Sequence, residues 1–263
     1  MCPNCRAFIT TDDKICPYCQ GEVAPRAVDR RSPSDAAGGL IPHARFTTTM
    51  ILLVNTGLYV AMMLYHAQAN GGNVGLDMDT KTEYLFGSNY PGGEWWRLIT
   101  AGFLHGGLLH ILMNSWVLFD LGPQVDEAFG TPRYLVFYLV STVTGFMTSS
   151  YFGYRSVGAS AGICGLIGAM IALHTRDHSS YATAMRRQYI QWVIYLLIFG
   201  FVVPNVDNAA HVGGLVGGFV LAYVAGTPRY SQAAESFWKI AAGGALALTA
   251  YAFLKMYLQL TAS

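Results

Sequence analysis

Two apolar stretches of the sequence carry residues of the types that serine hydrolases use. Ser160 lies in the run Gly-Ala-Ser-Ala-Gly that opens the stretch 158–174, and His211 lies near the start of the stretch 208–226. A serine hydroxyl is a weak nucleophile at neutral pH until a neighbouring base accepts its proton, and imidazole titrates in the range that this role requires. We therefore predict that Ser160 is a nucleophile and that His211 is its base.

His110 and Asn114 could supply the hydrogen-bond donors that such a reaction needs. They are four residues apart, so in a helix they share one face and can donate to the same oxygen atom. Ser160 lies among small residues at the predicted start of a helix, where backbone N–H groups have no intrahelical partner. The sequence predicts an oxyanion site formed by His110, Asn114 and the backbone at Ser160.

The predicted base has no carboxylate partner in the sequence pattern. Neither 158–174 nor 208–226 contains Asp or Glu, and Asp207 and Asn208 stand only at the rim of the second stretch. We therefore predict a Ser–His dyad and not a full triad.

Small residues predict how the serine and the histidine come together. They recur every four residues along 208–226 and form a comparable face along 158–174, and such faces let membrane helices approach closely. Close approach would bring the His211 ring within hydrogen-bonding distance of the Ser160 hydroxyl. The small residues are Ala210, Gly214, Gly218 and Ala222 in one stretch and Gly162, Gly165, Ala169 and Ala172 in the other.

The composition predicts that these stretches lie in a membrane. Apolar residues make up 53% of the 263 residues and charged residues only 12%, whereas a soluble domain has about 25% charged residues. We expect an all-α polytopic membrane protein, because each apolar stretch is near the length that a helix needs to cross the hydrocarbon layer. The predicted spans are 47–66, 98–121, 132–152, 158–174, 189–204, 208–226 and 237–260.

Lys and Arg residues predict the orientation of the chain. They concentrate before the first span and in the connections after the second, fourth and sixth, and positive connections of this kind face the cytoplasm. We therefore expect a cytoplasmic amino terminus and a site that opens to the outer side. No cleavable signal peptide or organelle signal is evident, which favours the bacterial plasma membrane. The net charge of +1 leaves no basic surface for nucleic acid.

The connection between the first two spans, roughly 68–96, is long and rich in aromatic residues. A connection of this length is usually ordered for a purpose, and we expect a partly embedded loop braced by Trp95, Trp96 and Arg97. An ordinary belt of aromatic residues at the membrane surface is the alternative.

Two Cys-x2-Cys pairs lie near the amino terminus, each with Pro after its first cysteine. This spacing is typical of a small zinc site of the ribbon type, in which four thiolates bind a structural Zn²⁺. We expect Cys2, Cys5, Cys16 and Cys19 to be the ligands. An unmetallated redox pair and a disordered tail are the alternatives, and the module offers a possible binding site for a cytoplasmic partner.

Taken together, the motifs resemble those of the rhomboid intramembrane proteases from about residue 47 to residue 226. The resemblance implies a Ser160–His211 dyad, oxyanion donors at His110 and Asn114, no cofactor for catalysis, and transmembrane proteins as substrates in the bilayer. The matching motifs are His105-x4-His110-x3-Asn114, Gly158-x-Ser160, Ala210-His211-x2-Gly214-x3-Gly218 and Trp96-Arg97.

The resemblance also defines the expected domains. The last span resembles the extra carboxy-terminal helix of some family members, so we expect a six-helix core followed by a seventh transmembrane helix. The predicted domains are a zinc-ribbon-like module at 1–22, a linker at 23–45 and a rhomboid-like protease domain at 46–263.

Three positions depart from the family pattern. Ala161 stands where a glycine usually follows the serine, so its methyl group could crowd the substrate. Cys164 replaces an aromatic residue that commonly packs on the catalytic imidazole. Asp126, in Gly122-x3-Asp126-x3-Gly130, replaces a glutamate, so any pairing with Arg97 would need a different geometry.

Two other functions fit parts of the pattern. A catalytically inactive relative that binds membrane proteins and directs their trafficking would retain the fold without turnover. A transporter or metal channel could use His105, His110 and His211, although a conduit needs polar groups through the whole bilayer.

Overall fold

A computed structural model describes residues 15–21, 43–73, 75–228 and 232–262. The chain divides into two compact units, 1–43 and 44–263. The second unit contains the predicted catalytic residues, and the helices described below form its architecture.

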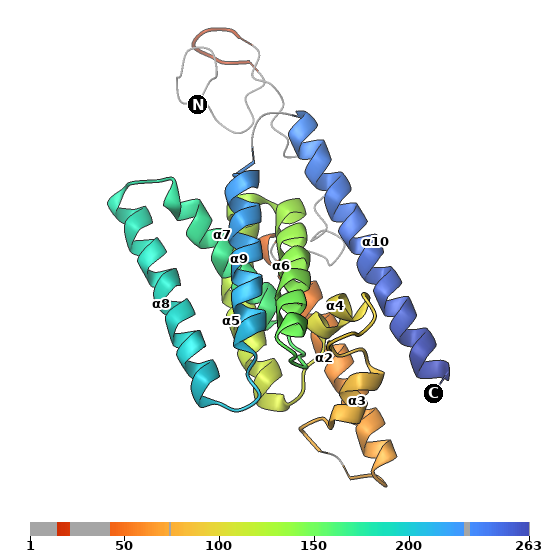
Figure 1. Ribbon diagram of the computed structural model, residues 1–263. Helices are drawn as coiled ribbons and strands as arrows, with labels where there is room; N and C mark the ends of the chain where they lie inside the picture. The colour runs from red at the N-terminus through yellow and green to blue at the C-terminus, as the bar shows by residue number, and fades with distance from the viewer. Residues whose placement is uncertain (1–14, 22–42, 74, 229–231, 263) are drawn as a thin grey trace. The chain divides into compact units, whose positions relative to one another are not determined.

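The second unit is built of helices (Figure 1). Its described residues form no β-strand, only two isolated bridges in loops. The helices are α2 (His43–Ala69), α3 (Thr80–Leu85), α4 (Arg97–Thr100), the 3₁₀ helix η2 (Ala101–Phe103), α5 (Leu108–Phe129), α6 (Thr131–Tyr151), α7 (Ser160–Thr175), α8 (Ser180–Val202), α9 (Asn208–Ala225) and α10 (Gln232–Ala262).

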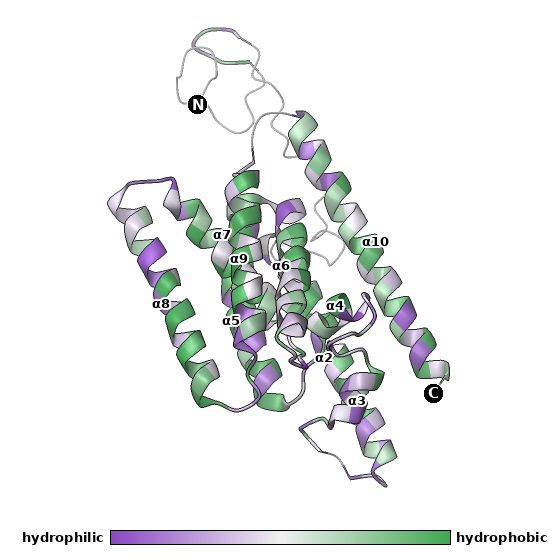
Figure 2. Cartoon of the chain, viewed as in Figure 1, coloured by the Kyte–Doolittle hydropathy of each residue, from purple (hydrophilic) through white to green (hydrophobic). Residues whose placement is uncertain are grey.

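Three helices of the described chain are long and apolar enough to cross a membrane. They are Arg45–Ala69 within α2, all of α9, and α10. Apolar residues cover most of α7 and α9 (Figure 2). Helix α7 has 16 residues, which is fewer than the roughly 20 that span the hydrocarbon layer.

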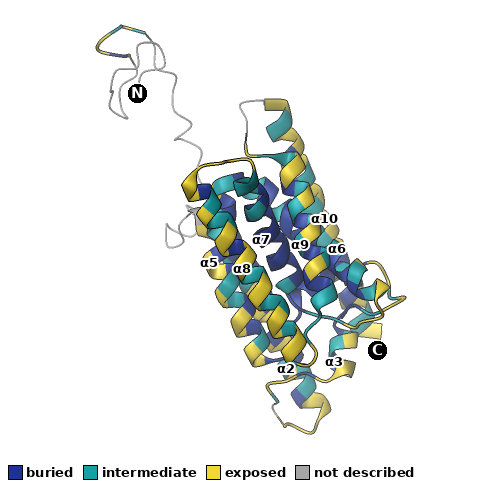
Figure 3. Ribbon diagram, turned by 60° about the vertical axis from the view of Figure 1, so that its left-hand side comes forward, coloured by how far each residue is buried: buried dark blue, intermediate teal, exposed yellow. Residues whose placement is uncertain are grey.

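Helix α7 lies at the centre, packed against α6 and α9. It is almost wholly buried, whereas α8 exposes residues along its length (Figure 3). Glycines permit the contact with α9: a side-chain carbon at Gly214 would collide with the Ala161 carbonyl, and one at Gly218 with the Gly165 carbonyl. The close approach of these two helices therefore follows the predicted small faces.

Gly162 does not belong to that contact, contrary to the prediction. A side-chain carbon there would lie 2.7 Å from the Tyr138 ring and 2.8 Å from the Thr142 hydroxyl. Both residues are on α6, so Gly162 lets α6 and not α9 approach α7. The spacing of small residues predicts which face of α7 is closely packed, but it does not identify which neighbouring helix packs against each residue of that face.

The second predicted span, 98–121, starts too early. Residues 98–107 contain the end of α4, η2 and an extended segment, and α5 begins only at Leu108. Gly107 precedes α5 with extended backbone angles, φ −170° and ψ 165°. His105 therefore lies in the segment before the helix, and only His110 and Asn114 share its face.

Helix α8 begins at Ser180, earlier than the predicted start near residue 189. Ser179 caps it, because the Ser179 hydroxyl accepts a hydrogen bond from the Ala182 N–H at 3.1 Å. The first half of α8 is polar, so the apolar pattern alone does not predict that the helix begins at this cap.

Helix α10 is attached to the bundle near both of its ends. Near the first, Arg133 of α6 donates two hydrogen bonds of 2.8 Å to the Glu235 carboxylate. Further along, the Tyr251 ring stacks on Trp95 with centroids 5.8 Å apart, and Phe253 packs edge-on against Phe103. The seventh predicted helix is thus part of the packed unit.

Candidate active site

Ser160 and His211 lie within hydrogen-bonding distance of one another. The His211 Nε2 atom is 3.0 Å from the Ser160 Oγ atom, across the contact between α7 and α9. Ser160 is the first residue of α7 and is half-buried, while His211 is buried one turn into α9. The start of α9 is fixed by Asp207, whose side chain accepts a hydrogen bond from the Ala210 N–H at 3.0 Å.

The far side of the His211 ring has no hydrogen-bond partner among the described residues. Its Nδ1 atom is buried and unpartnered. Asp207 is the nearby carboxylate in sequence, and the contact it makes through Oδ1 is the helix cap and not the imidazole. Among the residues that the structure describes, no side chain hydrogen-bonds the Nδ1 atom of His211, so the predicted Ser–His dyad stays a prediction that this geometry is compatible with.

His110 and Asn114 face the segment just before Ser160. A side-chain carbon at Gly158 would lie 2.6 Å from His110 Nε2 and 3.5 Å from Asn114 Nδ2. Gly158 has a φ of +127°, which L side chains rarely adopt, so glycine is required there on both grounds. The Asn114 Nδ2 atom is buried without a partner. Two side-chain nitrogens thus converge beside the strained turn that leads into Ser160.

His105 packs beside the donor pair without belonging to the same helix face. It is fully buried, and its ring lies edge-on to His110 with centroids 5.1 Å apart. His105 therefore contacts the candidate oxyanion donor and restricts where the His110 ring can lie.

The departures from the family pattern are accommodated in different ways. Ala161 is fully buried, and its methyl carbon would lie 2.7 Å from a side-chain carbon at Gly145 of α6. The methyl group therefore lies in the contact between α7 and α6. Cys164 is buried and forms no disulfide. Asp126 accepts a hydrogen bond from the Thr131 hydroxyl at 2.8 Å.

Two backbone bridges connect the long loop to the segments that carry these side chains. Asp77 pairs with Gly107, directly before α5, and Asn89 pairs with Ser156, shortly before α7. The Asn89 N–H and the Ser156 N–H each donate to the other residue's carbonyl at 3.0 Å. The sequence predicts an ordered loop but not these contacts, since nothing local marks a bridge between residues so far apart.

Of the four predicted zinc ligands, Cys2 and Cys5 lie outside the described residues. Cys16 and Cys19 stand on a tight turn: the Gln20 N–H donates to the Cys16 carbonyl and the Cys16 N–H to the Gly21 carbonyl, both at 2.9 Å. Within the described part of the chain there is no group of three or more potential metal ligands.

The apolar helices and the serine–histidine pair between them define a class: a helical membrane protein with the side-chain arrangement of a serine hydrolase. Comparison with known proteins makes the assignment specific. The model of the rhomboid domain matches residues 92–228. The chain belongs to the rhomboid family and is an integral membrane protein.

Several curated relatives carry rhomboid names. The chain is 35% identical to the rhomboid protease GluP of Bacillus subtilis (strain 168) over 182 residues, which are 66% of this chain and 35% of GluP. It is 32% identical to the putative rhomboid protease YdcA of the same organism over 149 residues, 56% of this chain and 74% of YdcA. It is 36% identical to RHOMBOID-like protein 4 of Arabidopsis thaliana over 136 residues, 51% of this chain and 34% of that protein. The chain thus covers about a third of the length of GluP and of RHOMBOID-like protein 4.

Proposed function

We propose that this protein is an intramembrane serine endopeptidase that cleaves transmembrane protein substrates with a Ser160–His211 dyad. The observation that carries the proposal is the 3.0 Å contact between His211 Nε2 and Ser160 Oγ. Rhomboid proteases among the relatives support the reaction class. Peptide-bond hydrolysis by a serine–histidine dyad requires no cofactor.

The reaction begins with proton transfer from Ser160 to His211. As the proton moves to Nε2, the serine oxygen attacks the scissile carbonyl carbon and its π electrons move onto the carbonyl oxygen. The side-chain nitrogens of His110 and Asn114 and the Ser160 N–H donate to that oxyanion. When the tetrahedral intermediate collapses, the C–N bond breaks and His211 returns the proton to the departing amine.

Hydrolysis of the acyl-enzyme repeats these steps with water as the nucleophile. His211 accepts a proton from water, the hydroxide adds to the ester carbonyl, and Ser160 leaves with the proton that His211 gives back. A substrate helix has to unwind locally before its backbone carbonyl can reach Ser160, because helical carbonyls are already bonded.

The membrane arrangement belongs to the same proposal. The positive connections support a cytoplasmic amino terminus and a site that opens to the outer side of a bacterial plasma membrane. Water for the second step would then enter from that side.

The amino-terminal module is proposed to bind a structural Zn²⁺. The turn at Cys16–Gly21 brings Cys16 and Cys19 onto one tight reversal of the chain, which fits one half of a four-thiolate site. Cys2 and Cys5 would supply the other half. A folded module of this kind would give a cytoplasmic partner a surface to bind.

An inactive membrane-protein binding factor is the second candidate. The replacement of an aromatic residue by Cys164 favours it, because a smaller side chain leaves the imidazole less restrained. Relatives named only rhomboid-like are also compatible with it. It predicts substrate binding without turnover.

Labelling with a fluorophosphonate probe separates the two candidates. The full chain in detergent is compared with Ser160→Ala and His211→Ala, and with the exposed positions Ser180→Ala and His178→Ala as controls. Labelling of the wild type and of both controls, lost in the two dyad variants, supports the protease. A folded wild type that is not labelled supports the binding factor.

A further inference from the structure

Gln259, near the end of α10, is hydrogen-bonded to a loop far from it in sequence. The Gln259 Oε1 atom accepts a hydrogen bond from Arg97 Nη2 at 2.6 Å. Its Nε2 atom donates to the Tyr84 and Leu85 carbonyls at 3.2 and 3.0 Å. Tyr84 and Leu85 end α3, where the Gly87 N–H also donates to the Tyr84 carbonyl at 3.1 Å. One side-chain amide therefore caps α3 and holds Arg97.

The Arg97 side chain is fully buried, and Gln259 is one of several groups that accept its hydrogen bonds. The Arg97 Nε atom donates to the Glu94 carboxylate at 2.7 Å, and Nη1 donates to the Tyr84 carbonyl at 2.8 Å. Glu94 is half exposed to solvent, so this ion pair alone compensates little of the cost of burying the charge. Gln259 supplies the acceptor for Nη2. The family pattern suggested Asp126 as the partner of Arg97. Asp126 lies near the end of α5, 18 positions beyond Leu108, and accepts a hydrogen bond from Thr131.

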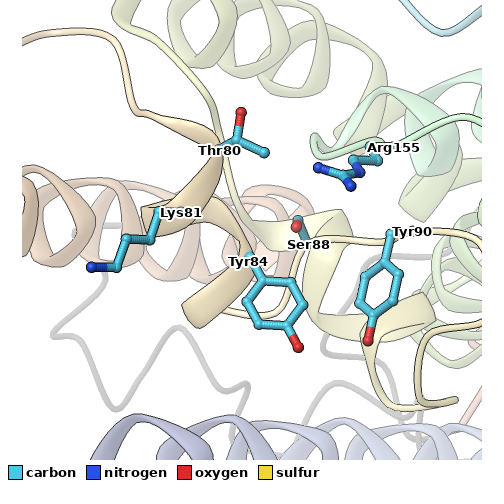
Figure 4. A pocket seen from close by; sticks show the side chains of 6 residues that line it. All are labelled: Thr80, Lys81, Tyr84, Ser88, Tyr90 and Arg155. Atoms are coloured by element: carbon cyan, nitrogen blue, oxygen red, sulfur yellow. The ribbon is translucent and has the colours of Figure 1, made fainter. Parts of the chain in front are cut away.

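The loop that Gln259 holds is bonded in turn to both sides of the active site. Its Asp77 pairs with Gly107, three residues before His110, and its Asn89 pairs with Ser156, four residues before Ser160. A pocket of about 300 Å³ lies between the loop and the segment before Ser156, and Figure 4 shows Arg155 among the side chains that line it. The pocket is lined by Thr80, Lys81, Tyr84, Ser88, Tyr90 and Arg155.

We propose that Gln259 is a positioning residue for the active site. Its amide fixes the end of α3 and Arg97, the loop built on them keeps its two backbone bridges, and the bridges fix the segments that carry His110 and Ser160. Through Gln259, helix α10 thereby helps to position the catalytic residues, in addition to crossing the membrane. The kinetic part of this inference rests on the proposed protease function.

Substitutions at Gln259 test the individual contacts. Gln259→Met keeps the length of the side chain and removes all three hydrogen bonds. Gln259→Glu retains an acceptor for Arg97 but loses both donors. Thr261→Ala is the matched control, because Thr261 is exposed on the same helix end and donates only to its own helix.

The first measurement is cleavage of a transmembrane substrate by the full chain in liposomes. For Gln259→Met we expect kcat to fall about tenfold or more with little change in KM, since misplacement of catalytic groups affects the reaction more than binding. Gln259→Glu should lose less, and Thr261→Ala should match the wild type. Wild-type kcat in Gln259→Met would overturn the proposal.

The second measurement is amide hydrogen exchange, which does not depend on activity. Gln259→Met should accelerate exchange of the Asn89 and Met78 amides, which donate to the Ser156 and Gly106 carbonyls. Unchanged exchange there would overturn the proposal. An inactive wild type whose loop nevertheless loosens in Gln259→Met would instead refute the protease function and leave the structural coupling intact.

Discussion

The Ala161 methyl group faces Gly145, and a side-chain carbon at Gly145 would stand 2.7 Å from it. The residue after Ser160 is an alanine where the family pattern has glycine, and the room for the additional carbon comes from α6. The methyl group is buried in the contact between α7 and α6. The glycine that accommodates this methyl group lies 16 positions upstream, where a side chain would collide with it.

Gly145→Ala should destabilise the protein. The new carbon would meet the Ala161 methyl group and the Ala210 carbonyl, each at 2.7 Å, and overpacking of this kind costs about 1–3 kcal/mol. Thermal unfolding in detergent measures the loss. Adding Ala161→Gly should restore part of it, because the contact with Ala210 remains. Gly243→Ala, where nothing lies within 4 Å, is the control, and a Gly145→Ala variant as stable as that control would contradict the interpretation.

Asn114→Ala should lower kcat by about 10²–10³, the usual effect of removing one oxyanion donor. The Asn114 Nδ2 atom is buried, has no partner and faces Gly158, so its hydrogen bond is available for the transition state and KM should change little. Cleavage kinetics of a transmembrane substrate measure both constants. Asn70→Ala, at an exposed position, should behave as the wild type. A rise in KM at unchanged kcat would show that Asn114 stabilises the bound substrate and the transition state equally, and so does not act as an oxyanion donor.

The residues of the candidate site could be proposed from the sequence because their signals are local. Ser160 among small residues, the four-residue spacing of His110 and Asn114, and the repeat of small residues around His211 are each visible within one helix. Their convergence followed from the small faces of two helices, and the structure places Ser160 and His211 3.0 Å apart.

The remaining features depend on partners distant in the chain. Gln259 is 162 positions from Arg97, and no pattern within α10 distinguishes it from any other polar residue in an apolar helix. The sequence predicts too early a start for α5 because residues 98–104 are as apolar as a membrane span. These residues instead form short helices and a loop, and α5 begins after the glycines that precede Leu108. An apolar stretch indicates that its residues are buried. Residues of packed loops and of membrane-spanning helices are both buried, so apolarity alone does not distinguish the two.

Glu83 should make the stability of the protein depend on pH. Burial, and then the neighbouring Asp79 carboxylate, raise the pKa of Glu83 from 4.5 to about 7. The folded state therefore holds the proton more tightly than the unfolded state, so the stabilisation is fully present below pH 4.5 and is lost as the pH rises through about 7.

Glu83→Gln removes this dependence because glutamine resembles the protonated carboxyl group. The melting temperature of the wild type should fall more steeply than that of Glu83→Gln between about pH 5 and pH 8, and the variant should be the more stable protein at the upper end. Glu127→Gln, at an exposed position on α5, should follow the wild type. Parallel curves for wild type and Glu83→Gln would refute the assignment.

Glu235→Ala should loosen the first end of α10. Arg133 is buried beneath Glu235 and donates to both carboxylate oxygens. Removing the acceptor leaves a buried guanidinium without its counter-ion, at a cost of about 2 kcal/mol or more. Glu235→Gln keeps an acceptor and should lose less. Chemical or thermal unfolding of the wild type and the two variants measures these losses, and wild-type stability in Glu235→Ala would show that the ion pair with Arg133 contributes nothing.

The zinc module can be tested by metal content. A site of four thiolates should hold about one Zn²⁺ per chain, and loss of any one ligand should weaken it strongly, because metal binding and folding of so small a module are coupled. We expect the purified full chain to contain zinc, and Cys16→Ser and Cys19→Ser to lose it. Cys164→Ser is the control, since Cys164 is buried within α7. Elemental analysis gives the stoichiometry, and zinc retained in both Cys16→Ser and Cys19→Ser would exclude the turn at Cys16–Gly21 as half of the site, because a Cys-x2-Cys pair cannot ligate without its thiolates.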